Sequence, residues 1–316
     1  MILTLTPNPS LDLTYGLDGL VRGEVQRAAS TTVEAGGKGI NVSRNLVANG
    51  AASLAVAPVG GPSGEQFLSL LGGLGMDLVR VPVEGAVRMN VSLAEVGGVL
   101  TKVNAAGPRL TEEELDLMLA RTAEAGRDAE WLALCGSLPP GAPADLYARA
   151  VSSGREAGCR VAVDGSGPAL EAAVGEGPDL IKPNGEELAD LVGRPLGTLG
   201  DVLAAADEVR AAGVGAVLVS LGADGAVLID EEGALHADTP PFVPASTVGA
   251  GDALLAGFLY AGGTGEAGLV EAVAWGAAAA RLPGSRGPTP ADLDREAVRL
   301  REDLDPKRIL KGEAPV

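Results

Sequence analysis

The sequence TVGAGDALLAGF, residues Thr247–Phe258, places three small residues, Gly249, Ala250 and Gly251, directly before Asp252 and an apolar segment. Small residues let a ligand approach the backbone N–H groups, and the positive end of a following helix favours an anion. A carboxylate just inside that helix stands where it can take a proton from a hydroxyl. The stretch therefore predicts an anion cradle beside a candidate base, or, more simply, a helix start whose first turn favours an acidic side chain.

Composition limits the class of protein. The chain has 316 residues, enough for one large α/β domain with a small appendage. Hydrophobic residues make up 46% and aromatic residues only 3%, so we expect a core of Ala, Val and Leu. A formal net charge of −18 disfavours binding to nucleic acid or to an anionic membrane surface.

Cysteine, histidine and the N-terminus exclude further classes. We expect Cys135 and Cys159 to be buried free thiols rather than a disulfide or a metal pair. His236 is the sole histidine, at a position that resembles a loop, so neither a histidine-based zinc site nor a Ser–His–Asp relay is expected. The opening MILTLTPNPS has no signal-peptide pattern, and no apolar run reaches the length of a membrane span, which predicts a cytoplasmic protein.

Strand-like and helical segments alternate along most of the chain, which is typical of a parallel sheet covered by helices, with ligands at the carboxyl ends of the strands. Two segments, 11–34 and 86–105, instead show two-residue alternation without helices, as antiparallel strands do. We interpret them as a small β-sheet that forms a lid. The core would then consist of residues 1–10, 35–85 and 106–316.

Two segments do not fit the glycine-rich patterns of well-known nucleotide-binding loops. EAGGKGIN (34–41) contains Gly–Lys, but Thr32 and Gly39 stand where a Walker A loop needs a glycine and a Ser or Thr. The N-terminal strand is not followed by G-x-G-x-x-G, which argues against an NAD-dependent dehydrogenase.

Taken together, six motifs resemble those of the ribokinase-like, or PfkB-type, sugar kinases in order and spacing, over the chain up to about residue 290. They are TPNPSLD (6–12), GGKGIN (36–41), GSLPPG (136–141), KPNGEE (182–187), SLGADG (220–225) and TVGAGD (247–252). The first motif resembles the branch that holds 1-phosphofructokinases, tagatose-6-phosphate kinases and minor 6-phosphofructokinases. The resemblance implies a Rossmann-like ribokinase fold, a mostly parallel sheet flanked by helices with a small β-sheet lid.

The resemblance also implies roles for the residues of the opening stretch. Asp252 would be the base that deprotonates the acceptor hydroxyl, and the amides of Gly249, Ala250 and Gly251 would hold the charge on the transferred phosphoryl group. This suits phosphoryl transfer, where catalysis is largely positioning and charge stabilisation.

The substrate and nucleotide residues follow from the same resemblance. The sugar contacts would be Asp12, Gly37 and Asn41. A sugar phosphate also needs cations, and these would be Arg27, Lys38 and Arg88, with Asn90 and Ser137 as neutral helpers; the alternative is that the arginines are simply exposed on the lid.

For the nucleotide, Asn184 and Glu187 would hold Mg²⁺ through water, and Lys182 would neutralise phosphates unless it is a surface lysine. Ser220, Gly222 and Gly225 would contact the nucleotide unless they form a plain turn, and the adenine would rest near Gly276 and Ala279.

The activity implied is that of an ATP- and Mg²⁺-dependent phosphosugar kinase, with fructose 1-phosphate as first choice. Tagatose 6-phosphate or fructose 6-phosphate is the second choice, and a nucleotide sensor without turnover is the alternative from another class. Relatives suggest a homodimer in which the lids clasp each other. Pro283 stands near the position where the family carries a polar residue of a potassium loop, which argues against monovalent-cation activation.

Overall fold

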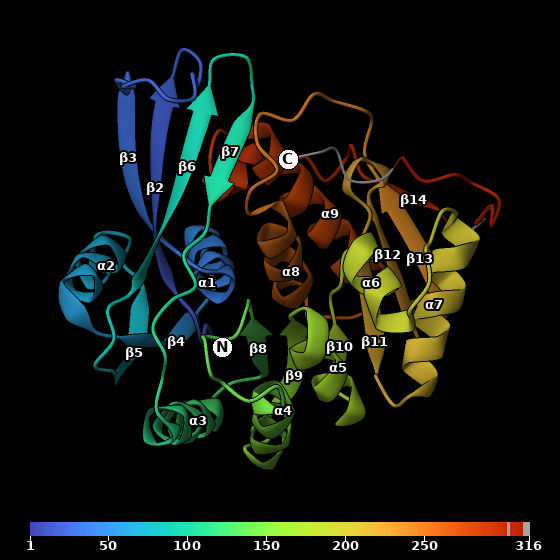
Figure 1. Cartoon of the computed structure of the whole chain (residues 1–316). Helices are drawn as coiled ribbons and strands as arrows, with labels where there is room; N and C mark the ends of the chain where they lie inside the picture. The colour runs from blue at the N-terminus through green and yellow to red at the C-terminus, as the bar shows by residue number, and fades with distance from the viewer. Residues whose placement is uncertain (302–303, 312–316) are drawn as a thin grey trace.

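The computed structural model describes residues 1–301 and 304–311 and contains a ten-stranded sheet with a separate four-stranded sheet (Figure 1). The large sheet has the strand order β14-β13-β12-β11-β10-β9-β8-β1-β4-β5. Its strands from β5 to β11 are parallel, whereas β12, β13 and β14 pair antiparallel at one edge. In chain order these strands are β1 (Ile2–Leu5), β4 (Ser53–Val59), β5 (Asp77–Pro82), β8 (Trp131–Cys135), β9 (Arg160–Asp164), β10 (Leu180–Ile181), β11 (Ala216–Ser220), β12 (Ala226–Asp230), β13 (Gly233–Asp238) and β14 (Arg299–Arg301).

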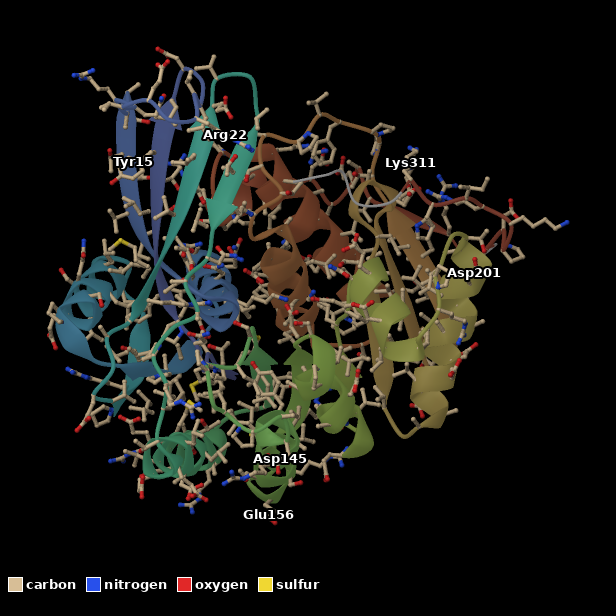
Figure 2. All side chains as sticks on the ribbon, viewed as in Figure 1. Tyr15, Arg22, Asp145, Glu156, Asp201 and Lys311 are labelled. Atoms are coloured by element: carbon tan, nitrogen blue, oxygen red, sulfur yellow. The ribbon has the colours of Figure 1, made fainter. Side chains whose placement is uncertain are left out.

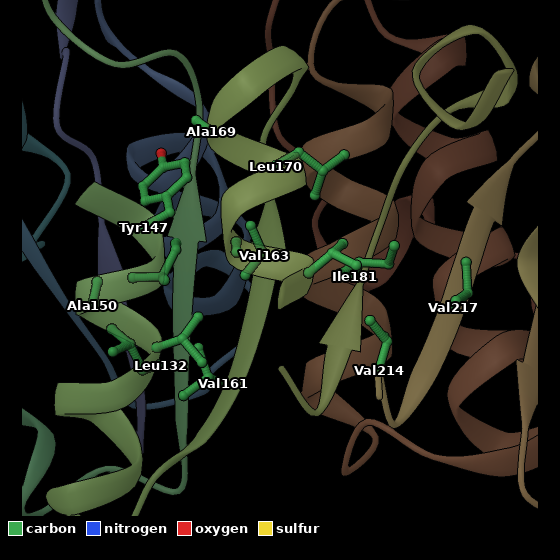
Figure 3. Close-up of a cluster of buried hydrophobic side chains, with 14 of the residues drawn as sticks. Leu132, Tyr147, Ala150, Val161, Val163, Ala169, Leu170, Ile181, Val214 and Val217 are labelled. Atoms are coloured by element: carbon green, nitrogen blue, oxygen red, sulfur yellow. The ribbon is translucent and has the colours of Figure 1, made fainter. Parts of the chain in front are cut away.

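Helices cover both faces of this sheet, because side chains along each buried strand alternate between two apolar clusters. In β8, Leu132 and Leu134 join one cluster, while Trp131, Ala133 and Cys135 join the other. The first face, part of which is drawn in Figure 3, packs against α3 (Glu112–Gly126), α4 (Leu146–Glu156), α5 (Gly167–Gly175), α6 (Gly185–Val192) and α7 (Leu199–Ala211). The opposite face packs against α1 (Lys38–Ala48), α2 (Gly61–Gly73), α8 (Ala250–Tyr260) and α9 (Gly265–Arg281). The predicted α/β fold class is confirmed.

The chain changes direction across the sheet at β1. From β1 it proceeds outward through β4 to β5, and the later strands β8 to β11 are then added on the other side of β1. In open α/β sheets the crevice outside the carboxyl ends of such neighbouring strands is where ligands bind. The crevice beyond Leu5 and Cys135 is therefore the expected ligand site.

The small sheet has the order β3-β2-β6-β7 and stands away from the large sheet beside α1 and α2 (Figure 1). Its strands are β2 (Ser10–Leu17), β3 (Ser30–Gly36), β6 (Arg88–Glu95) and β7 (Leu100–Val103). The pairs β2–β3 and β6–β7 are antiparallel as expected, but β2 and β6 pair in parallel. A parallel pair needs a long crossover, and here it contains β3, α1, β4, α2 and β5.

Other expectations from the sequence meet different outcomes. Cys135 and Cys159 are free and buried, as predicted. The expectation of a loop position for His236 is wrong, because the residue lies in β13 and is buried. Among the described residues, every helix is too short or too polar to cross a membrane.

Candidate active site

A cavity of about 230 Å³ opens at the carboxyl ends of β1 and β8, where the chain changes direction. Four predicted site residues line it: Lys38, Arg88, Ser137 and Glu187. The remaining lining residues are Thr6, Asn8, Gly136 and Ser166. The fold thus brings residues from distant parts of the chain together around one cavity, and four of these residues are candidates for binding sugar or nucleotide.

Asp252 lies in the first turn of α8 and is buried, with 7% of its surface exposed. The helix starts at Gly249, whose φ of 78° lies in the left-handed region that favours glycine. The Nδ2 amide of Asn41 donates a hydrogen bond of 2.7 Å to Asp252 Oδ2. Burial, followed by the nearby charge of Asp164, raises the pKa of Asp252. A raised pKa makes the carboxylate a better proton acceptor while it remains ionised.

Asp164, at the end of β9, is the centre of a charged cluster and is fully buried. Its Oδ1 accepts a 2.8 Å hydrogen bond from Lys38 Nζ, and Lys182 Nζ lies 3.4 Å from Oδ2. Lys38 Nζ also lies 3.7 Å from Glu187 Oε1. Burial works against the charge of Asp164, but the two lysines prevail and lower its pKa. Burial also opposes the charge of Lys38, but Asp164 and Glu187 prevail and raise its pKa, so Lys38 and Asp164 stay a charged pair near neutral pH.

Lys182 is not a surface lysine, because only 4% of it is exposed. A Cβ atom placed on Gly251 would lie 3.5 Å from Lys182 Nζ. The ammonium group therefore lies beside the start of α8, where the backbone N–H groups of Gly249, Ala250 and Gly251 were predicted to cradle an anion; that of Ala250 donates to the backbone oxygen of Thr247 at 3.3 Å. Lysine and helix start together favour a negatively charged group at this point.

Asp12 lies in β2 and is fixed by two neighbours. Asn90 Nδ2 in β6 donates to Asp12 Oδ1 at 2.9 Å, and Ser10 Oγ donates to the same oxygen at 2.8 Å. On the other side a Cβ atom on Gly36 would collide with Asp12 Oδ2. Gly37 follows with a φ of 118°, which favours glycine. The small sheet thus fixes one Asp12 oxygen and leaves Oδ2 against a backbone without a side chain.

The two predicted phosphate-binding arginines lie at opposite ends of the small sheet. Arg88 lines the cavity and donates to the carbonyl oxygens of Asn8 and Ala105 at 3.0 and 2.9 Å. Arg27 lies in the loop beyond the Gly16–Ser30 strand pair and is exposed, so the structure does not bring it to this cavity. Figure 2 shows Arg22, from the same loop, at the outer end of the sheet.

Asn184 and Glu187 form a capping box at the start of α6. Asn184 Oδ1 accepts from the backbone N–H of Glu187 at 2.7 Å, and Glu187 Oε2 accepts from that of Asn184 at 2.9 Å. Glu187 Oε1 takes no part in the capping box and lies 3.7 Å from Lys38 Nζ, and Glu187 borders the cavity. The described residues contain no cluster of three or more His, Cys, Asp or Glu side chains suited to a metal ion. One carboxylate oxygen fits a Mg²⁺ ion held through water and not one held by protein ligands alone.

The other predicted nucleotide residues lie at the edge of the sheet and between helices. Ser220, at the end of β11, pairs with Asn184 in an isolated parallel bridge, which brings two of the predicted motifs side by side. Gly225 has no room for a side chain, because a Cβ atom there would collide with the backbone of Ala237. Gly276 packs against Leu254 of α8. Helix packing alone therefore explains the small residue at 276, and its contact with adenine stays a prediction.

The lining residues that we did not predict had a detectable signal. Thr6 and Asn8 belong to the TPNPSLD motif, and Gly136 belongs to GSLPPG. Asp164, which does not line the cavity but binds Lys38, is the last residue of the apolar strand β9, at the carboxyl end where α/β sheets place functional groups. A rule that tests every polar residue at a predicted strand end would have included it.

Comparison with known proteins extends over the same regions. Residues 6–288 match the pfkB family carbohydrate kinase domain. A 1-phosphofructokinase of Rhodobacter capsulatus is 38% identical over 262 residues, which cover 82% of this chain and 83% of the relative. Among solved structures, phosphofructokinase-2 from Escherichia coli in complex with potassium has a TM-score of 0.88 at 34% identity, covering 92% of this chain and 96% of that one. The same enzyme in complex with fructose-6-phosphate has a TM-score of 0.84 at 33% identity, covering 90% and 95%.

These similarities extend over most of the chain and include the strands and helices that carry Asn41, Asp164 and Asp252. The chain therefore belongs to the pfkB family of carbohydrate kinases.

Proposed function

We propose that the protein is an ATP-dependent phosphosugar kinase that transfers the γ-phosphate of ATP to the C6 hydroxyl of fructose 1-phosphate. The observation that carries this proposal is the buried Asp252 at the start of α8, hydrogen-bonded to Asn41. A binding protein without turnover needs no such base beside its ligand. The curated relative from Rhodobacter capsulatus, a 1-phosphofructokinase, supports the choice of substrate.

In the proposed reaction, Asp252 accepts the proton of the sugar hydroxyl as the hydroxyl oxygen attacks the γ-phosphorus. The amides of Gly249, Ala250 and Gly251 and the Lys182 ammonium group bind the equatorial oxygens of the transferred group, where charge develops. Lys38 lies between Asp164 and Glu187 at the cavity and offers a second positive charge. Mg²⁺, held through water near Glu187 and Asn184, would neutralise nucleotide phosphate charge.

On the sugar side, Asp12, Gly37, Asn41, Asn90 and Ser137 are proposed to bind hydroxyl groups, and Arg88 the phosphate of the substrate. The guanidinium group of Arg88 matches phosphate oxygens with paired N–H donors. The alternative substrates are fructose 6-phosphate and tagatose 6-phosphate, phosphorylated at C1. The complex of phosphofructokinase-2 from Escherichia coli with fructose-6-phosphate supports this alternative.

The nucleotide is proposed to extend from Lys182 along the motifs at the carboxyl ends of β10 and β11. Asn184, Glu187, Ser220, Gly222 and Gly225 would contact its phosphates and ribose, and Gly276 and Ala279 the adenine. The parallel bridge between Asn184 and Ser220 supports a continuous binding edge. A supply of ATP and sugar phosphate is consistent with a reaction in the cytoplasm.

The small sheet, residues 11–34 and 86–105, is proposed to act as a lid that excludes water during transfer. We further propose a homodimer in which two lids pack together. Phosphofructokinase-2 from Escherichia coli has a tetrameric inhibited form, which supports self-association in the family. If Arg27 binds substrate phosphate, it must do so in the other copy, since it lies at the outer end of its own lid.

The test is ADP release with Mg·ATP and fructose 1-phosphate, fructose 6-phosphate, tagatose 6-phosphate, or free fructose, compared by kcat/KM for the wild type and Asp252→Asn. We expect fructose 1-phosphate to be preferred, and the variant to lose about 10²- to 10⁴-fold in kcat while still binding nucleotide. Preference for a 6-phosphate would select the alternative substrates. Turnover that is unchanged in Asp252→Asn, or absent in the wild type, would contradict the proposed mechanism.

A further inference from the structure

Arg44 lies one turn after Asn41 in α1 and is mostly buried, with 11% of its side chain exposed. Its Nη2 donates to two acceptors, Asn41 Oδ1 at 3.0 Å and the backbone oxygen of Ser285 at 2.6 Å. Its Nη1 lies 3.8 Å from Glu34 Oε1 in β3. Ser285 Oγ in turn donates to Glu34 Oε2 at 2.9 Å. Arg44 therefore joins α1 to the lid strand β3 and to the segment after α9.

These contacts fix which way the amide of Asn41 points. A guanidinium group has donors only, so the Asn41 atom that faces Arg44 must be the carbonyl oxygen. The amide nitrogen then faces Asp252 Oδ2, which accepts its hydrogen bond. Asn41 alone could rotate its amide by half a turn when Asp252 becomes protonated. With Arg44 present, the carbonyl oxygen of Asn41 stays engaged and the donor stays on Asp252.

The orientation matters for where a proton can go. No residue that the structure describes donates a hydrogen bond to the other oxygen of Asp252, Oδ1. A proton removed from a hydroxyl can therefore enter at Oδ1 while Oδ2 keeps the Asn41 bond. In that step the hydroxyl oxygen bonds to the γ-phosphorus, the bond from the γ-phosphorus to the bridging oxygen breaks, and ADP leaves.

We propose that Arg44 is a positioning residue that acts through Asn41, holding its amide as a fixed donor so that Asp252 receives the proton on Oδ1. This inference rests on the proposed role of Asp252 as the base. Arg44 itself touches neither substrate nor the reacting atoms. Because its other partners are Glu34 and Ser285, the same residue connects the lid strand to the base.

The chain offers a matched control directly after the same helix, at the C-cap residue Asn49. Asn49 Nδ2 donates to the backbone oxygen of Pro288 at 2.8 Å, so it also joins α1 to the segment after α9. Unlike Arg44, its side chain makes no bond to Asn41 or Asp252 within the described chain. If Arg44 only held this segment in place, Asn49→Ala should cause the same loss of activity as replacement of Arg44.

The experiment measures kcat, both KM values, the pH dependence of kcat and the melting temperature for the wild type, Arg44→Met, Arg44→Lys and Asn49→Ala. The groups that face Asp252, and that stay unchanged in these variants, are Asp164, Lys38, Lys182, Cys135 and Asn41. The Asn41 bond lowers the pKa of Asp252, so its disturbance should move the acid limb of the kcat profile to higher pH.

We expect Arg44→Met to lower kcat about 10- to 100-fold, the range for misplacement of a reacting group, with the acid limb shifted upward and the KM for ATP nearly unchanged. Arg44→Lys, which keeps one donor group, should recover part of the loss. Asn49→Ala should keep the kcat and acid limb of the wild type.

Two results would overturn the inference: a folded Arg44→Met with the kcat and acid limb of the wild type, or equal losses in Arg44→Met and Asn49→Ala. If Arg44→Met does not fold, Arg44→Gln, whose short amide cannot hold both Asn41 and Ser285, decides by the same criteria. Asp252→Asn separates this failure from that of the proposed function. An inactive Asp252→Asn beside an unaffected Arg44→Met removes only the role of Arg44, whereas an active Asp252→Asn removes the base.

Discussion

Asp164 shows how a single buried charge can hold the site together. It is fully buried and receives Lys38 on one oxygen and Lys182 on the other. Burial of a charge without a partner is strongly destabilising. Removal of one member of a buried ion pair therefore destabilises the fold, because it leaves the other charge buried and uncompensated. Asp164 therefore allows two lysines to stand at the cavity and at the start of α8.

Replacement of this carboxylate by the amide of the same shape tests that role. Asp164→Asn should lower the free energy of unfolding by about 3 kcal/mol, because Lys182 stays buried without a negative partner. Denaturant titration measures the change. Asp116→Asn, which removes an exposed pair with Arg149, is the control and should change the free energy of unfolding by less than about 1 kcal/mol. If the two variants lose equal free energy of unfolding, the pairing of Asp164 with the lysines does not stabilise the fold more than an exposed ion pair does.

Arg88 offers a test of the substrate class. Arg88→Ala should raise the KM for the sugar phosphate about 10- to 100-fold, because charged hydrogen bonds contribute roughly 1.5–3 kcal/mol, and should leave the KM for ATP nearly unchanged. Steady-state kinetics with each substrate varied in turn measure both. Arg80→Ala, at an exposed pair with Glu65, is the control. A KM for the sugar phosphate that stays at the wild-type value would remove Arg88 from the phosphate site.

At the scale of elements, the strands of the small sheet position Asp12, a candidate for sugar binding, through close packing. Gly36, the last residue of β3, lies against the carboxylate of Asp12, which Asn90 and Ser10 hold in place. Any side chain at 36 must displace that carboxylate. The last residue of β3 thus limits where Asp12, a candidate for sugar binding in the neighbouring strand β2, can lie.

Gly36→Ala is therefore expected to raise the KM for the sugar several-fold, about the effect of one lost hydrogen bond, while the protein remains folded. Kinetics together with circular dichroism measure the two properties. Gly72→Ala in α2 has open space around it and should instead stabilise the helix by roughly 0.5–1 kcal/mol. If Gly36→Ala keeps the wild-type KM for the sugar, Asp12 can move without weakening sugar binding.

Local patterns predicted many of these elements but not all their pairings. The alternation of strand-like and helical segments predicted the layered sheet, and four of the six motifs supply six of the eight residues that line the cavity. The parallel pairing of β2 with β6 was missed, because alternation within a strand says nothing about the direction of a partner reached through a long crossover. Asp164 was missed because its partner Lys38 lies 126 residues away, and only the folded sheet brings them together.

At the scale of the whole molecule, a charged cluster holds the C-terminal segment to the sheet. Asp238 in β13 accepts from Arg299 and Arg301 in β14, and Arg308 donates to Asp224 at 2.8 Å. His236 lies buried in the same cluster, with Nε2 2.7 Å from the backbone oxygen of Asp224. The cluster thereby connects the last described residues to the turn at Gly222–Asp224, which is a candidate for nucleotide binding.

His236 makes stability depend on pH. Burial lowers its pKa below the ordinary 6.5, so the unfolded chain binds a proton more readily than the folded one. The free energy of unfolding should therefore fall as the pH drops from about 7 to 5.5. His236→Gln, which cannot titrate but can still donate a hydrogen bond, should show a smaller fall in denaturant titrations at the two pH values. A fall of the same size in both proteins would exclude His236 as its source.

The hydrogen bond between Asn41 and Asp252 has a consequence for synthesis of the chain. It joins residues that are 211 positions apart, and α8 emerges from the ribosome only after most of the sheet-forming sequence. Such long-range closure is slow compared with local folding, and a nascent chain that ends before α8 has neither the base nor its partner bond. The ATP-consuming chemistry is thereby withheld until α8 has been synthesised.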